Sequence, residues 1–251
     1  MKKKENVANT HEAVDVQIEN EIFEAGKQVQ LRTTELIITS VFLTLGLFFF
    51  GIGVTSLWSV AILLFGALWN FFTDSNKLFA CIFAFCLCIP YALFCIDIGM
   101  YGHAFLHLLF YIPTQLVYYI ENQHREDVSI LASKKLETAG FVGAVVAGIF
   151  LTFGVSLALY NMNNFFFIFD AVSVVLLAFA VFLVNGRYKE YWGVRLFAVA
   201  FASLMWLLVG LFTDWADGTI IFALLFAMYF VADFVKYFDW KKNNKRKNII
   251  S

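Results

Sequence analysis

Polar side chains recur at helical spacing in an otherwise apolar segment. The members are His103, His107, Tyr111, Thr114, Gln115, Tyr118 and Asn122. At about 100° per residue, all of them fall within one sector of about 120° on a helix. Imidazole, amide and phenol groups donate and accept hydrogen bonds, and tyrosine rings also attract flat cations. This chemistry is typical of a surface that binds a small polar solute.

Two interpretations of this polar stripe follow from its length. The stripe covers roughly 28 Å at 1.5 Å per residue, which is close to the thickness of a bilayer core. It can line a solute path, or it can form a seam to a neighbouring helix. Pro113 favours the path, because it leaves the carbonyl near Leu109 without its usual partner beside a cavity. His103 and His107 have the spacing of a metal pair, but no third ligand accompanies them and no metal is predicted.

The composition of the chain indicates a polytopic membrane protein. Of the 251 residues, 61% are hydrophobic and only 15% are charged. The apolar residues gather in blocks of roughly 17–25, the length that crosses a membrane as a helix. A formal net charge of −1 gives no sign of nucleic-acid binding.

The hydropathy pattern predicts an all-α protein with eight transmembrane helices. Their expected ranges are Glu35–Val54, Trp58–Thr73, Leu78–Met100, Gly102–Asn122, Ala139–Tyr160, Asn163–Asn185, Tyr191–Phe212 and Thr219–Tyr237. Polar tails at 1–34 and 238–251 flank them. Cys81, Cys88 and Cys95 share one face of the third helix and are interpreted as small packing residues.

Charge distribution sets the expected orientation. None of the 18 Lys and Arg residues falls in an outside loop when eight helices start from a cytoplasmic N-terminus. Asp97, Asp170, Asp214 and Asp217 then lie at or near the outer surface. These carboxylates form either ordinary solvated loops and helix caps or an acidic mouth that concentrates cations.

Three segments resemble the PnuC family of vitamin transporters. One segment runs from Asp170 to Trp192 and carries Asp-Ala, an apolar helix and then Arg187, Tyr188, Glu190 and Trp192. The second is "GMYGHAFLHLLFYIPTQ", and the third is the aromatic and basic "YFDWKK". Together they cover most of the chain from Tyr101 to Lys242.

The resemblance implies a fold like that of the SWEET sugar transporters. Two three-helix bundles would be formed by residues 58–122 and 163–237. A glycine-rich linker helix, residues 139–160, would pack between them, and residues 35–54 would form an extra N-terminal helix. It also implies facilitated diffusion of a vitamin-like solute, such as nicotinamide riboside, across a bacterial plasma membrane without a cofactor. A cytoplasmic kinase would then trap the solute. The oligomeric state is left open between a monomer and a homo-oligomer.

Candidate functional residues follow from the stripe and from the resemblance. The expected solute contacts are His107, Tyr111, Gln115, Tyr118, Asn122, Asp170 and Trp206; the expected structural or gating residues are Pro113, Arg187, Tyr188, Glu190 and Trp192. Glu190 is expected to pair with a basic side chain at the inner surface.

The chain departs from the family pattern at several pocket positions. Arg195 and Val199 stand where the family favours Trp and Asn, and Val181 and Ala232 replace a Gln and an Asn. The substrate therefore stays open among nicotinamide riboside, thiamine, another vitamin and a nucleoside. A membrane enzyme using Asp97 and Asp170, or a signalling scaffold, are the rival classes.

The charge pattern yields a first prediction. A reporter protein fused after Ser251 should be active only when it functions in the cytoplasm, because all the Lys and Arg residues gather on one side. A periplasmic reporter at the same position is the control and should stay inactive. Activity of the periplasmic reporter alone would reverse the orientation.

Overall fold

The computed structural model describes residues 32–73, 76–122, 135–186, 188–215 and 218–250. An N-terminal helix covers Arg32–Gly51. The following elements are α2 (Leu57–Thr73), α3 (Lys77–Asp97), α4 (Tyr101–Phe105), the π-helix η1 (Leu106–Tyr111), α5 (Ile112–Asn122), α6 (Thr138–Asn161), α7 (Phe167–Asn185), α8 (Tyr191–Phe212) and α9 (Thr219–Ile250).

Each of the eight predicted helices has a helical counterpart among the described residues. Six of the helices are long and apolar enough to cross a membrane, and α2 is a shorter apolar helix. The predicted fourth helix is one run of three successive segments, α4, η1 and α5. These observations confirm an all-helical polytopic membrane protein.

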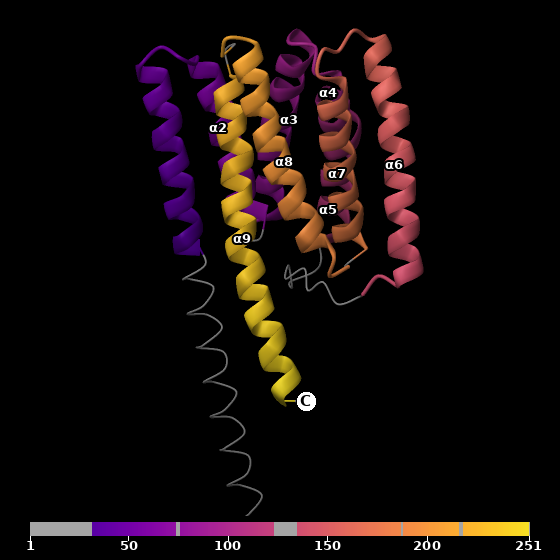
Figure 1. Ribbon diagram of the computed structural model, residues 1–251. Coiled ribbons are helices and arrows are strands. Elements are labelled where there is room, and N and C mark those ends of the chain that lie inside the picture. Colours follow the sequence, from indigo (N-terminus) through magenta and orange to yellow (C-terminus); the bar gives the residue numbers. More distant parts are fainter. Residues whose placement is uncertain (1–31, 74–75, 123–134, 187, 216–217, 251) are drawn as a thin grey trace, which may run out of the picture.

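The predicted first and third helices end three residues early, at Gly51 and Asp97. Two further boundaries differ from the expected positions for local reasons. The predicted start at Asn163 is wrong because this residue has φ 59°, outside the helical region. The Asn164 side-chain oxygen accepts a hydrogen bond from the Phe166 N–H at 2.8 Å, and α7 begins only afterwards. At the other end of the chain, α9 continues past Tyr237 to Ile250, because no Gly or Pro interrupts it. Its last turns extend beyond the other helices (Figure 1).

A π-helical segment interrupts the run that carries the polar stripe. The N–H of Ile112 donates to the carbonyl of His107, five residues earlier, so η1 holds more residues per turn than an α-helix. A wheel at 100° per residue therefore does not give the angular positions of the residues beyond η1. His107 and Tyr111 are buried, whereas Gln115 is only half-buried.

Thr114, which follows Pro113 on α5, hydrogen-bonds to the backbone of η1. The hydroxyl of Thr114 donates to the carbonyl of Phe110 and also lies 3.2 Å from the carbonyl of Tyr111. The single Thr114 hydroxyl proton is therefore shared between two backbone carbonyls of η1, which satisfies the hydroxyl inside the apolar segment.

The helices pack in two groups that meet along their sides (Figure 1). In the first group, α3 contacts α2, α4, η1 and α5; in the second, α8 contacts both α7 and α9. The groups touch through α2 with α9 and through α4 and η1 with α7. One continuous core of buried apolar side chains runs through both groups. In Figure 1 the described N-terminal helix starts, and α9 ends, at the same end of the molecule.

The position of α6 corrects one expectation. This helix contacts α7 and α4 and stands at the edge of the molecule (Figure 1). A Cβ atom placed on Gly143, Gly148 or Gly154 would meet no atom within 4 Å. The glycine-rich helix is therefore not packed between the two groups in this chain. By contrast, Cys81, Cys88 and Cys95 are buried on one face of α3, as predicted.

A close approach joins α2 to α9 beside the interface of the two groups. A Cβ atom on Gly66 would lie 2.4 Å from Leu225 Cδ1 and 2.7 Å from the Tyr229 hydroxyl oxygen. The Tyr229 hydroxyl donates to the Gly66 carbonyl at 3.2 Å. A side chain at position 66 would therefore force Leu225 and Tyr229 to shift.

The carboxylate of Asp170 fixes α4 against α7. It accepts hydrogen bonds from the N–H of Gly102 at 2.8 Å and of His103 at 3.0 Å, and from the Asn164 side chain at 2.7 Å. These are donors that the first turn of a helix cannot satisfy internally. Any side chain at position 102 would collide with the carboxylate, because a Cβ atom would lie 2.7 Å from Asp170 Oδ1. Asp170 is fully buried, so the expectation that it forms part of an outer acidic surface is wrong.

Removing this carboxylate should destabilise the protein. Asp170→Ala leaves three buried donors without their acceptor, and each costs about 1–3 kcal/mol. The melting temperature of the purified protein in detergent should therefore fall strongly. Asp97→Ala, which removes an exposed carboxylate at the same end, is the matched control and should change it little. Equal melting temperatures for the two variants would contradict the capping role.

Candidate functional site

A buried chain of hydrogen bonds connects the two helix groups. The indole N–H of Trp206 donates to the Tyr91 hydroxyl oxygen at 2.9 Å. His103 Nδ1 lies 2.9 Å from the same oxygen, and His103 Nε2 lies 2.6 Å from Ser173 Oγ. Ser173 Oγ also lies 3.2 Å from the Asp170 carbonyl and 3.4 Å from Met205 Sδ, and neither can donate, so Ser173 directs its proton to this side and accepts from His103 Nε2–H. The Nδ1 of the neutral His103 ring then accepts the Tyr91 proton.

His107 continues this network toward the cavity. Its Nδ1 lies 2.8 Å from the carbonyl of His103, which can only accept, so Nδ1 carries the proton. In the neutral ring, Nε2 is left as an acceptor. The ring packs against Tyr91 with centroids 4.3 Å apart and against Tyr111 at 5.1 Å. The orientation of His107 is therefore fixed by its neighbours.

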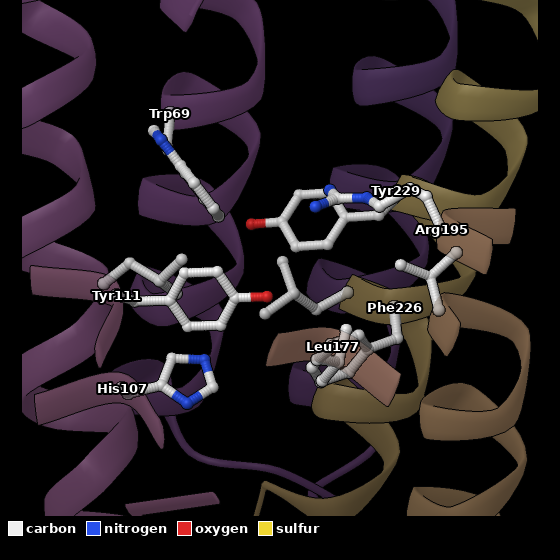
Figure 2. A pocket seen from close by; sticks show the side chains of 10 residues that line it. Trp69, His107, Tyr111, Leu177, Arg195, Phe226 and Tyr229 are labelled. Atoms are coloured by element: carbon white, nitrogen blue, oxygen red, sulfur yellow. The ribbon is translucent and has the colours of Figure 1, made fainter. Parts of the chain in front are cut away.

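A small cavity lies where the two helix groups meet (Figure 2). Its lining consists of Trp69, Leu87, His107, Tyr111, Leu177, Arg195, Val199, Leu225, Phe226 and Tyr229. They come from α2, α3, η1, α7, α8 and α9. The cavity measures about 10 Å³, close to the room that one water molecule requires. The structure is therefore a closed arrangement of the site.

Aromatic rings form much of the wall. Trp69 meets Tyr111 edge to face with centroids 6.2 Å apart and meets Tyr229 at 5.8 Å. Phe226 meets Tyr229 at 6.1 Å. Such rings bind flat heteroaromatic solutes by stacking, and they attract cations at their faces.

One formal charge faces this wall in the described part of the chain. Arg195 Nε donates to Asp233 Oδ2 at 2.8 Å, and both side chains are largely buried. The two residues lie on adjacent helices, α8 and α9. The pair keeps the local charge balanced while placing a guanidinium beside the aromatic rings.

The structure brings some of the expected solute contacts together and separates others. His107 and Tyr111 line the cavity. Asp170 and Trp206 are fully buried and hydrogen-bonded elsewhere, and neither belongs to the lining. Gln115 is half-buried on α5, also outside the lining. The side chains of Tyr118 and Asn122 lie outside the described residues.

Of the expected structural residues, Pro113 lies on α5, whereas Tyr188, Glu190 and Trp192 lie at the turn between α7 and α8 or in the first turn of α8. Arg187 lies outside the described residues, whereas the Tyr188 N–H donates to the Leu183 carbonyl at 3.0 Å. Glu190 Oε2 accepts a hydrogen bond from the Leu136 N–H at 3.2 Å, so its described contact is to backbone rather than to a basic side chain. The ring of Trp192 packs beside Tyr237 and Trp240 of α9. These contacts tie the turn to the start of α6 and to α9.

Several residues of the cavity were not predicted as part of a site. Trp69, Arg195, Phe226 and Tyr229 belong to its lining, and Asp233 holds the guanidinium. A signal existed for the charged pair, because ionised residues inside transmembrane helices commonly mark functional sites. The aromatic residues gave no such signal in a chain with 31 phenylalanines and 10 tyrosines.

The fold and the cavity define a helical membrane protein with an occluded polar and aromatic site between two helix groups. Among known protein families, the one described as nicotinamide mononucleotide transporter matches residues 56–242 of this chain. The chain belongs to this family. It is therefore a membrane transporter, and the predicted resemblance to PnuC is confirmed.

A solved structure agrees with this assignment. The crystal structure of the vitamin B3 transporter PnuC is similar over 85% of this chain and 92% of that chain, with a TM-score of 0.67 and 22% sequence identity. At this identity the likeness establishes the fold. A search of curated proteins finds no significant match.

The buried network should contribute stability. Tyr91→Phe removes the acceptor of the Trp206 N–H and the donor to His103, each costing about 1–3 kcal/mol in a buried site. The melting temperature of the purified protein should fall clearly. Tyr160→Phe is the control, since Tyr160 is exposed on α6 and its replacement should leave the melting temperature nearly unchanged. A similar small effect for both variants would show that the network contributes little to the stability of the protein.

Proposed function

We propose that this transporter carries a flat, vitamin-like or nucleoside-like solute through the cavity between the two helix groups. Nicotinamide riboside is the first candidate; thiamine, another vitamin and a nucleoside are the alternatives. The observation that carries the proposal is the aromatic wall of Trp69, Tyr111, Phe226 and Tyr229 at the place where the groups meet. Family membership supports a vitamin-related solute.

Transport would proceed by alternating access. The closed cavity has room for about one water molecule, so a solute of nucleoside size requires the groups to move apart. In repeat-built transporters, rocking of one helix group against the other opens a central site to each side in turn. A SWEET-like arrangement of two three-helix bundles is consistent with the observed contacts among α2 to α5 and among α7 to α9. Facilitated diffusion needs no cofactor, and a cytoplasmic kinase would trap the solute.

The residues divide into two proposed roles. His107 and Tyr111 would contact the solute in the cavity, and Gln115, Tyr118 and Asn122 would follow along the same helical run as part of the path. The hydrogen bonds of Asp170 and Trp206 support a positioning role through α4 and Tyr91.

The proposed setting is a bacterial plasma membrane, with both chain ends in the cytoplasm. The start of the described N-terminal helix and the end of α9 lie on the same side of the molecule, which agrees with both chain ends facing one compartment (Figure 1). Lys241 and Lys242, exposed on the protruding part of α9, suit the cytoplasmic face.

The aromatic wall yields a direct test. Trp69→Ala should weaken solute binding by roughly 2- to 30-fold, corresponding to about 0.5–2 kcal/mol of lost ring contact. Binding is measured on purified protein with a panel of vitamins and nucleosides, and uptake into proteoliposomes with the best ligand.

The matched control is Trp58→Ala, because this tryptophan lies on the same helix and is 60% exposed. Trp58→Ala should keep the affinity of the parent protein. An equal loss in both variants would remove the cavity from the transport path, and absence of binding across the whole panel would refute the proposed solute class.

A further inference from the structure

The guanidinium of Arg195 has unused hydrogen-bonding capacity at the cavity. Its Nε is engaged by Asp233, and the side chain is 14% exposed. A guanidinium has several further N–H donors in a rigid fork. Within the described part of the chain these donate to no protein acceptor. Figure 2 shows the side chain extending from α8 toward the interior of the cavity.

A second donor faces the same space from the other helix group. Tyr111 is 5% exposed, and within the described residues its hydroxyl makes no hydrogen bond. Figure 2 shows this hydroxyl directed into the cavity. Since both donors face the cavity, a bound molecule with acceptor oxygens would accept hydrogen bonds from Tyr111 and Arg195 together.

The charges at the cavity restrict which molecule fits. Arg195 and Asp233 offset each other, so the empty site has no net formal charge from this pair. A cationic ring alone would add an uncompensated positive charge in a region of low dielectric constant, which is unfavourable. A solute that carries both a cationic ring and a carboxylate adds no net charge. Its carboxylate can also bind the free edge of the guanidinium in a two-point contact.

We propose that Arg195 determines specificity in this cavity and that the solute is a flat heteroaromatic compound bearing a carboxylate. The aromatic residues hold the ring, the free edge of Arg195 holds the carboxylate, and Tyr111 donates to one of its oxygens. Asp233 acts as a positioning residue that orients the guanidinium. This inference rests on the proposed function. Within the proposed vitamin-like or nucleoside-like class, it replaces nicotinamide riboside as the first candidate with solutes that carry a carboxylate.

The test uses a matched pair of ligands. Nicotinic acid riboside and nicotinamide riboside differ only in a carboxylate against a carboxamide, and their affinities for the full-length purified protein are measured by calorimetry. The acid should bind about 10- to 150-fold more tightly, the range expected for a charge-assisted hydrogen bond. Tighter or equal binding of the amide would overturn the inference.

Variants of Arg195 test whether this residue causes the preference for the acid over the amide. Arg195→Gln should bring the ratio of the two affinities to about one. Since this change leaves Asp233 buried without its partner, the double variant Arg195→Gln with Asp233→Asn removes both charges at similar volume and is expected to give the same ratio. Lys241→Gln removes an exposed positive charge far from the cavity and should keep the preference. Persistence of the preference in the folded double variant would overturn the role of Arg195.

The same measurements separate this inference from the proposed function. Binding of neither riboside, together with binding of another vitamin or nucleoside that lacks a carboxylate, overturns the carboxylate preference and leaves the transport proposal intact. Absence of binding across the whole panel overturns both.

Discussion

The carboxylate of Asp170 at the first turn of α4 is the contact on which the arrangement of the two helix groups depends. It accepts hydrogen bonds from the backbone N–H of Gly102 and of His103 in the first helix group. It also accepts one from the side chain of Asn164, just before α7 in the second helix group. A charged group placed in an apolar interior is stable only when its acceptor positions are filled. Gly102 is required because any side chain would occupy the position of this carboxylate. The segment around Gly102 and the segment that begins at Asp170, both of which resemble the family, therefore contact each other through this carboxylate.

From this fixed end, the helix that carries the site reaches the cavity through a π-helical segment. His107 and Tyr111 of η1 line the cavity together with residues of α2 and α9, whereas Gln115 on α5 is half-buried outside it. His107 in turn receives its orientation from the His103 carbonyl, and His103 is held by Tyr91 and Ser173. The site is therefore supported by a second layer of buried hydrogen bonds, which limits how its polar atoms can move.

The charged pair at the cavity differs in chemistry from the aromatic wall around it. The residues that join the helix groups lie in the segments that resemble the family, and Arg195 places a guanidinium among the aromatic side chains of the cavity. Burying a guanidinium required a partner, and Asp233 on the adjacent helix provides it at 2.8 Å. A buried pair of this kind contributes little net stability compared with apolar residues of similar volume. Its presence at a cavity is better explained by recognition of a solute than by packing.

The sequence by itself determined the helical stretches and the uneven distribution of positive charge, because hydropathy and the cost of burying Lys and Arg are local properties of a segment. It also indicated His107 and Tyr111 as polar groups inside a membrane. Only the tertiary structure decided that Trp69, Arg195 and Tyr229, from three separate helices, converge on one cavity. It likewise decided that Asp170 and Trp206 are buried and hydrogen-bonded inside the protein instead of lining the cavity. The π-helical register and these convergences depend on contacts between residues far apart in the chain, and no periodicity within a single helix can encode them.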